Sequence, residues 1–157
     1  MSAKIVYGMM RDGEEKAISD LVSRVFSEFV APGYTSEGID TFMAYTEPDA
    51  IDLRSLLGHN FVLTAKAGGL IVGAIEVRGH EHICLLFVDK EYQRRGIARE
   101  LIRRAIVKCS KRRGFEYLSV NASPFAVPVY ARLGFVQTDK EQLQDGIRYI
   151  PMLLVCK

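Results

Sequence analysis

Hydrophobic residues recur along the chain with two different periods, and the period indicates where helices and strands lie. A continuous apolar run at residues 5–10 predicts the first strand. Residues 15–29 carry apolar side chains at helical spacing, after a capping-box-like start and before a Pro-Gly pair that ends the helix. Residues 36–57 have a weaker helical pattern, which Pro48 divides into two short helices. The N-terminal third therefore predicts one strand followed by helices.

The middle of the chain predicts strands that pair in sequence order. Two β-type runs, residues 61–66 and 70–78, are joined by an Ala-Gly-Gly turn, which is a hairpin signal. A third run at residues 82–88 follows a turn. The period then changes, because residues 98–109 place their apolar side chains on one helix face, and this long helix ends near Gly114.

The C-terminal part returns to strands. Residues 117–122 predict a strand, residues 124–133 a helix, and residues 135–137 and 148–155 the last two strands. An antiparallel hairpin region followed by a β-α-β unit predicts a mixed sheet with helices on its faces. We expect residues 1–157 to form a single domain, because the length fits one domain and there is no repeat or linker.

Composition excludes several classes of protein. The chain is 48% hydrophobic and 25% charged, as in ordinary globular proteins, and its net charge is only +2. That charge is too small to favour nucleic acid or a membrane surface. No segment approaches the roughly 20 consecutive apolar residues of a membrane-spanning helix. We therefore expect neither a nucleic-acid nor a membrane partner.

The cysteines and histidines do not form a metal-binding pattern. Cys84, Cys109 and Cys156 are far apart and lack Cys-x-x-Cys spacing, so neither a disulfide framework nor a zinc site is predicted. His80 and His82 share a face of a predicted strand, but no third ligand accompanies them. Together with the lack of a secretory signal, these features predict a reduced, cytoplasmic protein without a metal.

Residues 85–98 carry most of the chemical information. A strand that ends at Val88 leads into a turn of sequence Gln-Arg-Arg-Gly-Ile-Ala at residues 93–98, where a helix begins. Helix N-termini leave backbone N–H groups unpaired and bind anions, and Gly96 lets the backbone approach a ligand closely. Residues 90–113 contain ten lysines and arginines but two glutamates. This segment predicts a site for a phosphate-rich ligand.

Simpler interpretations remain open at this point. The basic residues from Arg103 to Arg113 could form only a solvated helix face, and one glycine before a helix is weak evidence for phosphate binding. The common phosphate motifs G-x-x-x-x-G-K-[ST] and G-x-G-x-x-G with a downstream acid do not occur. A nucleic-acid face is disfavoured, because no aromatic residues lie between the basic ones at residues 99–113.

The turn resembles the acyl-CoA-binding motif [Q/R]-x-x-G-x-[G/A] of the GNAT superfamily of N-acetyltransferases, with Leu86 and Val88 as the preceding L-x-V. Residues 121–135 are similar to the family's N-x-S…A-x-x-x-Y-x-x-x-G-F segment. One departure is Ala98, where glycine is commoner. The resemblance implies an α/β (α+β) fold, with a mixed, mostly antiparallel sheet of about seven strands flanked by about four helices. It also implies a central splay between the fourth and fifth strands.

The resemblance further implies how acetyl-CoA binds. Backbone amides of the turn would hold the pyrophosphate, with nearby polar side chains in support. The pantetheine arm would pair with the strand backbone, and the Val88 N–H would polarise the thioester carbonyl. Asn121 would hydrogen-bond the pantetheine or a bridging water. The expected contacts are Phe87, Val88, Gln93, Arg94, Arg95, Gly96, Ile97, Ala98, Arg99 and Asn121.

Proton transfer needs an acid and a base. In this family a tyrosine protonates the departing thiolate, and Tyr130 stands at the matching position, although it could serve only as a packing anchor. His82 is the first candidate for the base, because period-two counting puts it on the same strand face as Val88. Glu76 is its rival, followed by Glu81, and His82 could also be a solvated edge residue.

The function that these features predict is N-acetyl transfer from acetyl-CoA to a primary amine of a small molecule or peptide, by direct attack in a ternary complex. Tyr34, Phe42 and Tyr45 are expected to line the amine pocket. The alternative is a non-catalytic module that binds acyl-CoA. Homodimers are common among proteins of this kind, so a dimer is compatible with the resemblance.

Overall fold

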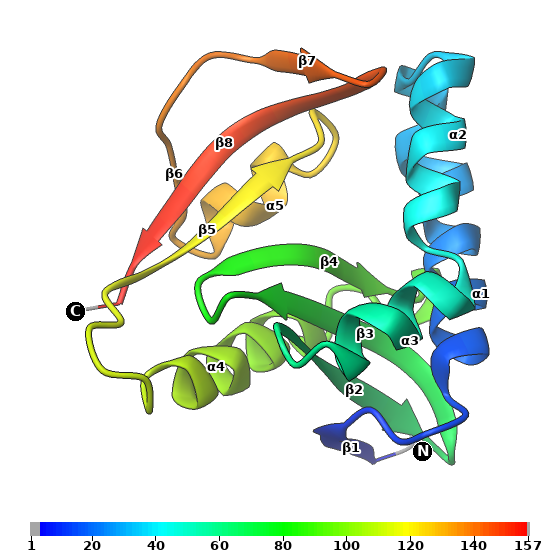
Figure 1. Ribbon diagram of the computed structural model, residues 1–157, viewed down its shortest axis with the longest axis vertical. Helices are drawn as coiled ribbons and strands as arrows, with labels where there is room; N and C mark the ends of the chain where they lie inside the picture. Colours follow the sequence, from blue (N-terminus) through cyan, green and yellow to red (C-terminus); the bar gives the residue numbers. More distant parts are fainter. Residues whose placement is uncertain (1–3, 157) are drawn as a thin grey trace.

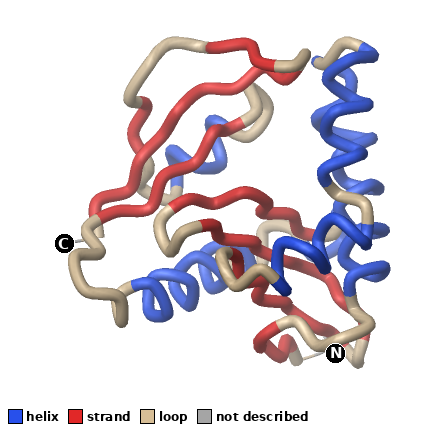
Figure 2. Tube along the Cα trace, in the orientation of Figure 1, coloured by secondary structure: helices blue, strands red, loops and turns tan. Residues whose placement is uncertain are grey.

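The structure is a computed structural model and describes residues 4–156. Within these residues, eight strands form a sheet in the order β1-β2-β3-β4-β5-β8-β6, and β7 pairs with β8 (Figures 1 and 2). The strands are β1 (Ile5–Met9), β2 (Asn60–Ala67), β3 (Leu70–Arg78), β4 (His82–Val88), β5 (Tyr117–Ala122), β6 (Val136–Gln137), β7 (Gln142–Gln144) and β8 (Ile147–Val155). The α-helices are α1 (Glu15–Val25), α2 (Ser36–Tyr45), α3 (Pro48–Leu56), α4 (Ile97–Cys109) and α5 (Val127–Arg132).

The helices cover the two faces of the sheet with separate apolar cores. One core combines β2–β5 and β8 with α4 and α5, and includes Leu101, Leu118 and Tyr130. The other combines α1 and α3 with the opposite side of β2–β4, and includes Leu21, Ile51 and Leu85. Figure 1 shows α4 on one side of the sheet and α1 to α3 together on the other. The mixed α/β architecture inferred from the element order is therefore confirmed.

The sheet opens between β4 and β5, as the resemblance implied. These two strands are parallel and pair only at His82–Ser119 and Ile83–Val120, whereas the other neighbouring strands are antiparallel. Beyond Ile83 the two ribbons diverge, as the green and yellow strands of Figure 1 show. The splay leaves the C-terminal half of β4 without a strand neighbour on that side.

A β-bulge at Cys84 changes which way the β4 side chains point. The pairing with β3 runs from Glu76–Leu85 to Val77–Ile83, which leaves Cys84 as the extra residue. Ile83 and Val88 both pack in the α4 core, although five positions separate them, and Leu85 packs in the α1 core. Period-two counting across β4 was therefore wrong, because the bulge puts His82 on the opposite face from Val88.

The β7–β8 hairpin packs against α2, and the sequence predicted only its second strand, β8. Thr41 of α2 donates a hydrogen bond to the Asp145 carbonyl (2.8 Å), in the turn of the hairpin. The contact is so close that a Cβ atom on Gly38 would lie 2.1 Å from the carbonyl oxygen of Gly146. Strand β7 itself was missed, because its sequence Gln-Leu-Gln is short and mostly polar.

Other departures from the predicted elements are confined to their ends. The first helix continues after Val25 as a π-helical turn (Phe26–Val30) and a 3₁₀ turn (Ala31–Gly33), whereas one regular helix was expected. A second 3₁₀ turn (Lys90–Tyr92) precedes the motif at residues 93–98. Helix α5 is shorter than the predicted 124–133. The π-helical turn matters for the site, because such turns reshape the helix surface.

Candidate active site

The turn between β4 and α4 has the backbone of an anion-binding site. Gly96 precedes the first residue of α4 with φ at 79°, and Arg94 also has a positive φ of 64°. Arg94 is not a glycine, so this left-handed conformation is locally strained, which is common where a ligand is held. No side chain caps the helix, so its first N–H groups remain available to an anion.

The hydrogen bonds of β4 determine which backbone groups face the splay. Asp89 donates its N–H to the Val72 carbonyl (2.8 Å), so in an antiparallel ladder the alternate residues Val88 and Leu86 point their backbone groups away from β3. Phe87, paired with Ala74, points its groups toward β3. The expectation that the Phe87 backbone faces the gap was therefore wrong, and Leu86 takes its place.

Gln93 ties the turn to the strand. Its side-chain amide donates a hydrogen bond to the Val88 carbonyl oxygen at 3.0 Å. The Val88 carbonyl is thereby occupied, and the Val88 N–H is left facing the splay. Gln93 thus holds the end of β4 in place rather than standing free.

A cavity of about 590 Å³ joins the turn, the splay and helix α5. Its walls include the π-helical turn, the open edge of β4, the start of α4 and the end of β5. The residues from the expected site that line it are Phe87, Val88, Gln93, Arg94, Gly96, Ile97, Ala98, Arg99, Asn121 and Tyr130. The cavity therefore brings together ten of the residues that the sequence singled out.

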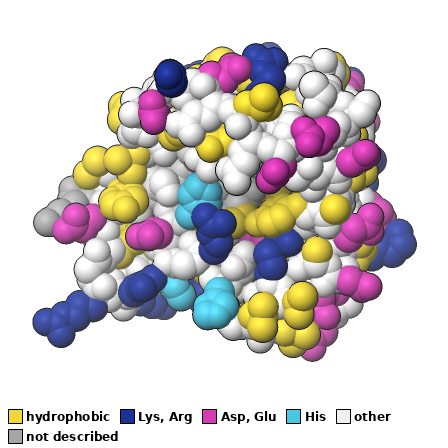
Figure 3. Space-filling model, turned by 45° about the horizontal axis from the view of Figure 1, so that its top comes forward, with side chains coloured by type: hydrophobic (Ala, Val, Ile, Leu, Met, Phe, Trp, Pro, Cys, Tyr) yellow, Lys and Arg dark blue, Asp and Glu magenta, His cyan; other side chains and the backbone are white. Residues whose placement is uncertain are grey.

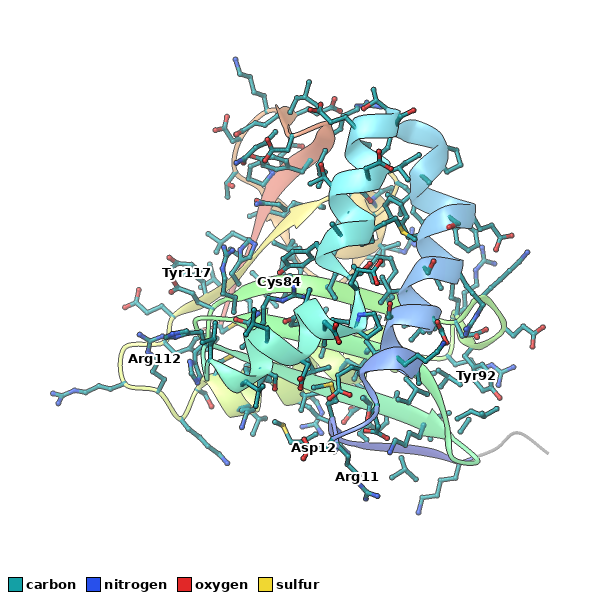
Figure 4. The ribbon with its side chains drawn as sticks, turned by 45° about the vertical axis from the view of Figure 1, so that its right-hand side comes forward. Arg11, Asp12, Cys84, Tyr92, Arg112 and Tyr117 are labelled. Carbon is teal, nitrogen blue, oxygen red and sulfur yellow. The ribbon has the colours of Figure 1, made fainter. Side chains whose placement is uncertain are left out.

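The arginines around the turn have different surroundings. Arg94 and Arg99 line the cavity, and Arg132 of α5 also lines it, although no motif pointed to it. The guanidinium group of Arg95 instead lies 4.9 Å from the centre of the Tyr92 ring. Arg95 itself does not line the cavity. Tyr92 is labelled in Figure 4. Arg103 bonds to Glu100 on the exposed side of α4. The basic residues farther along α4 thus belong to the helix surface and not to this cavity.

Tyr130 is almost completely buried, with 6% of its surface exposed, and its ring packs edge-on against Phe135 at 5.2 Å. Burial raises the pKa of its hydroxyl group, so that it holds its proton at neutral pH. In residues 4–156 the Tyr130 hydroxyl has no hydrogen-bond partner. Every side-chain polar atom in these residues that is fully buried does have a partner, so the hydroxyl is not fully buried. Tyr130 lines the first cavity. The Tyr130 hydroxyl therefore opens into the cavity. Tyr130 therefore packs against Phe135 and also keeps its hydroxyl proton at neutral pH.

His82 lies at the other end of the splay, at a second cavity of about 300 Å³. Its Nδ1 atom lies 2.8 Å from the Ser119 hydroxyl oxygen on β5. Burial, and then the charge of Arg78, lower its pKa to about 4. The ring is consequently neutral at physiological pH.

Ser119 orients the His82 ring. The Ser119 hydroxyl is also 3.3 Å from the Glu81 carbonyl, which can only accept a hydrogen bond. Both contacts are hydrogen bonds when Ser119 donates to Glu81 and accepts from Nδ1–H of His82. In that arrangement the free lone pair of His82 is on Nε2. Nothing in the sequence pattern of β5 pointed to Ser119, because the pairing of β4 with β5 creates this contact.

Glu76 is held in a buried ion pair. Arg54 of α3 donates from Nε and Nη2 to the two carboxylate oxygens, both at 2.9 Å, and Asn60 donates to Oε2 at 2.8 Å. The Glu76 side chain is 1% exposed. Three donors thus occupy the carboxylate, and it lines neither of the two cavities.

The two cavities are neighbours, since Cys84 and Asn121 line both of them. Figure 4 shows Cys84 in the middle of the molecule, beside the β4 ribbon. Tyr34 and Phe42 line the first cavity, whereas Tyr45 lines the second, so the expected aromatic pocket is divided between them. Phe42 stacks on Phe26 with ring centres 4.0 Å apart. The space-filling view shows histidine and basic side chains beside an apolar strip on one face (Figure 3).

The described part of the chain offers no cluster of metal ligands. Within residues 4–156, no three His, Cys, Asp or Glu side chains are grouped so that they could hold a metal ion. His80 lies in the turn before β4, with a positive φ of 62°, so it does not share a strand face with His82 as expected. In the same residues, no helix has the length and apolar character needed to cross a membrane.

Comparisons with known proteins agree with this geometry. Residues 30–156 match the acetyltransferase (GNAT) domain family. The chain is 36% identical over 99 residues to YafP of Escherichia coli strain K12, an uncharacterized N-acetyltransferase, and this match covers 63% of the chain and 61% of the relative. The chain therefore accounts for less than two thirds of that relative's length.

Solved structures show the same fold. The PaiA N-acetyltransferase of Thermoplasma acidophilum, solved in complex with coenzyme A, has a TM-score of 0.79 at 18% identity, with 97% of this chain and 99% of that chain covered. A GCN5-related N-acetyltransferase from Rhodopseudomonas palustris has a TM-score of 0.78 at 21% identity, with 99% and 98% covered. With the family match over residues 30–156, these findings show that the chain belongs to the GNAT superfamily of acetyltransferases.

Proposed function

We propose that this protein transfers the acetyl group of acetyl-CoA to a primary amine of a small molecule or peptide, by direct attack in a ternary complex. The observation that carries the proposal is the first cavity, which combines a helix N-terminus with unpaired amides, an open strand edge and the hydroxyl of Tyr130. The complex of coenzyme A with PaiA, a protein of the same fold, supports the choice of donor.

The donor would bind along the first cavity. The amides at the start of α4 would donate hydrogen bonds to the pyrophosphate, with Arg94 and Arg99 adding charge-assisted hydrogen bonds. The amide groups of the pantetheine arm would pair with the backbone of Leu86 and Val88, as an added strand does. The Gln93 side chain donates a hydrogen bond to the Val88 carbonyl oxygen and leaves the Val88 N–H facing the splay. This N–H would donate a hydrogen bond to the thioester carbonyl and polarise it.

His82 and Tyr130 would move the protons. The amine nitrogen attacks the thioester carbon, the C–S bond breaks, and the amide bond forms. The proton that the nitrogen loses would pass, through water, to Nε2 of His82. The departing thiolate would take a proton from the hydroxyl of Tyr130. We assign Glu76 to structure and not to proton transfer, because Arg54 and Asn60 occupy its carboxylate.

The test is release of free coenzyme A by the purified protein, measured with a thiol reagent across a panel of amines. We expect at least one amine to give turnover. Tyr130→Phe should lower kcat by roughly 10²-fold, the usual contribution of a general acid, with little change in acetyl-CoA binding. Tyr117→Phe is the matched control, because Tyr117 is exposed on β5 and lines neither cavity.

Two results would contradict the proposal. Tight binding of acetyl-CoA without turnover on any amine would identify a binding module instead of an enzyme. Turnover that is unchanged in Tyr130→Phe would remove Tyr130 from the role of acid and leave it as a packing residue.

A further inference from the structure

The second cavity contains an arginine that the protein itself leaves unpaired. Arg78, at the end of β3, is exposed to solvent and lines this cavity beside His82. Burial is the larger cause of the lowered pKa of His82, and the positive charge of Arg78 is the second cause. In residues 4–156 its guanidinium group makes no hydrogen bond, ion pair or ring contact, whereas Arg54 and Arg148, which also lie near the site, are paired with Glu76 and Glu141.

The lining of the same cavity also includes a carboxylate. Asp145, in the turn of the β7–β8 hairpin, lines the cavity, and its side chain also has no partner in the described residues. Arg78 and Asp145 form no ion pair with each other, since none within 4.0 Å joins them. With His82 neutral, the cavity therefore has one positive and one negative group and no net charge. A ligand with one carboxylate complements Arg78 better than a polyamine, which has none, or a dicarboxylate, whose second charge Asp145 repels.

The position and size of the cavity restrict the ligand further. Cys84 and Asn121 line both cavities, so the second cavity borders the first beside the splay. Its volume of about 300 Å³ is at the lower limit for ligand pockets and suits a small molecule. Tyr45 and Tyr149 supply apolar walls for a side chain.

We propose that the acetyl acceptor is a small amino acid, whose carboxylate binds Arg78 while its amine reaches the junction of the two cavities. This inference rests on the function proposed above and names its substrate class. An arginine binds a carboxylate through paired, charge-assisted hydrogen bonds, so the recognition is both geometric and electrostatic. Asp145 disfavours acceptors with a second carboxylate.

The experiment compares each amino acid with its own carboxamide, which keeps the amine and side chain but lacks the charge. Arg78→Gln should lower kcat/KM for the amino acid by roughly 10–100-fold, mainly through KM, and leave the carboxamide within about twofold. Arg78→Lys should restore part of the loss. Comparing the variant with the wild type on each acceptor cancels the different basicities of the two amines. Arg113→Gln, at an exposed arginine outside the cavity, is the matched control and should match the wild type on both acceptors.

A binding measurement makes the result independent of turnover. Calorimetry with protein saturated in coenzyme A should detect the amino acid more strongly than its carboxamide, and Arg78→Gln should remove the difference. Equal losses for both acceptors in Arg78→Gln, or an amino acid preference that survives the substitution, would overturn the inference while leaving the acetyl transfer intact. Failure of every amine to release coenzyme A would instead count against the proposed function.

Discussion

His82 and Tyr130 both have pKa values displaced by burial, and both are therefore neutral at physiological pH. A buried histidine loses its proton more readily, so His82 is neutral and can accept one. A buried tyrosine keeps its proton at neutral pH, so Tyr130 would still carry a proton for the thiolate, although the raised pKa makes the hydroxyl a weaker acid. At the residue scale, therefore, the same physical cause keeps both groups neutral, which is the starting state that the proposed base and the proposed acid require.

The displaced pKa of His82 makes stability depend on pH. Between pH 6.5 and about 4 the unfolded histidine binds a proton and the folded one does not, so the free energy of unfolding falls as the pH is lowered through this window. We expect His82 to account for a loss of about 2 kcal/mol, once solvent screening is allowed for. The measurement is urea unfolding of the wild type and His82→Gln at pH 6.5 and 5.

Two comparisons check this prediction. His59→Gln, at an exposed position, should keep the pH dependence of the wild type. A His82→Gln protein whose stability falls with pH as steeply as that of the wild type would show that the histidine is not the titrating group.

At the element scale, ion pairs and close backbone contacts connect the helices to the sheet. Arg54 attaches α3 to β3 through Glu76, and it also lies 3.8 Å from the centre of the Tyr45 ring, at the end of α2. Helix α2 in turn supports the β7–β8 hairpin through the contact of Gly38 with Gly146. These contacts hold the walls of the second cavity in place.

Glu76→Gln should destabilise the fold. The substitution keeps the shape but leaves the charge of Arg54 without its counterion, and breaking such a buried pair costs about 3–5 kcal/mol. Thermal unfolding measures the loss, with Glu81→Gln, at an exposed glutamate, as the matched control. A Glu76→Gln protein of normal stability but much reduced kcat would instead make Glu76 the base.

Gly38→Ala should loosen the hairpin. The added Cβ would lie 2.1 Å from the Gly146 carbonyl oxygen, so the backbone has to shift, at a cost of about 1–3 kcal/mol. The KM of the amine should rise as well, because the hairpin forms a wall of the second cavity. Gly8→Ala is the control, since a Cβ at that position meets nothing within 4 Å. Equal unfolding temperatures for the two variants would contradict the prediction.

At the scale of the whole molecule, the splay divides the sheet into two parts that share one apolar core but little strand pairing. Strands β1–β4 form one part and strands β5–β8 the other, and β4 and β5 pair at only two positions. A ligand that enters the splay would supply the missing hydrogen bonds to β4. Its binding energy would stabilise the folded molecule as a whole.

Hydrogen exchange can test this effect on individual amides. Coenzyme A should slow the exchange of the Leu86 and Val88 amides, which face the splay, and should change the Phe87 amide much less, since it points toward β3. Mass spectrometry with residue-level fragmentation, or NMR, would resolve the three amides. If Phe87 were protected and its neighbours were not, then the Phe87 amide would face the splay, and the amides of Leu86 and Val88 would point toward β3.

Much of the fold could be predicted because its signals are local. The order of strands and helices follows from periods of two and 3.6 residues, and the motif at residues 93–98 identified the turn at the head of α4. Strand β7 was missed, because three mostly polar residues give no period. Its pairing depends on β8, which follows it in the chain.

The sequence by itself determined the family, the types of most elements and the place where a helix N-terminus meets a strand end, since all of these depend on neighbouring residues. Only the tertiary structure decided which candidates can act. The bulge at Cys84 puts His82 on the other face of β4, Arg54 binds Glu76 from 22 positions away, and Ser119 contacts His82 where β4 pairs with β5. These contacts join residues that are distant in the sequence, and no local pattern encodes a hydrogen bond whose partner lies on another element.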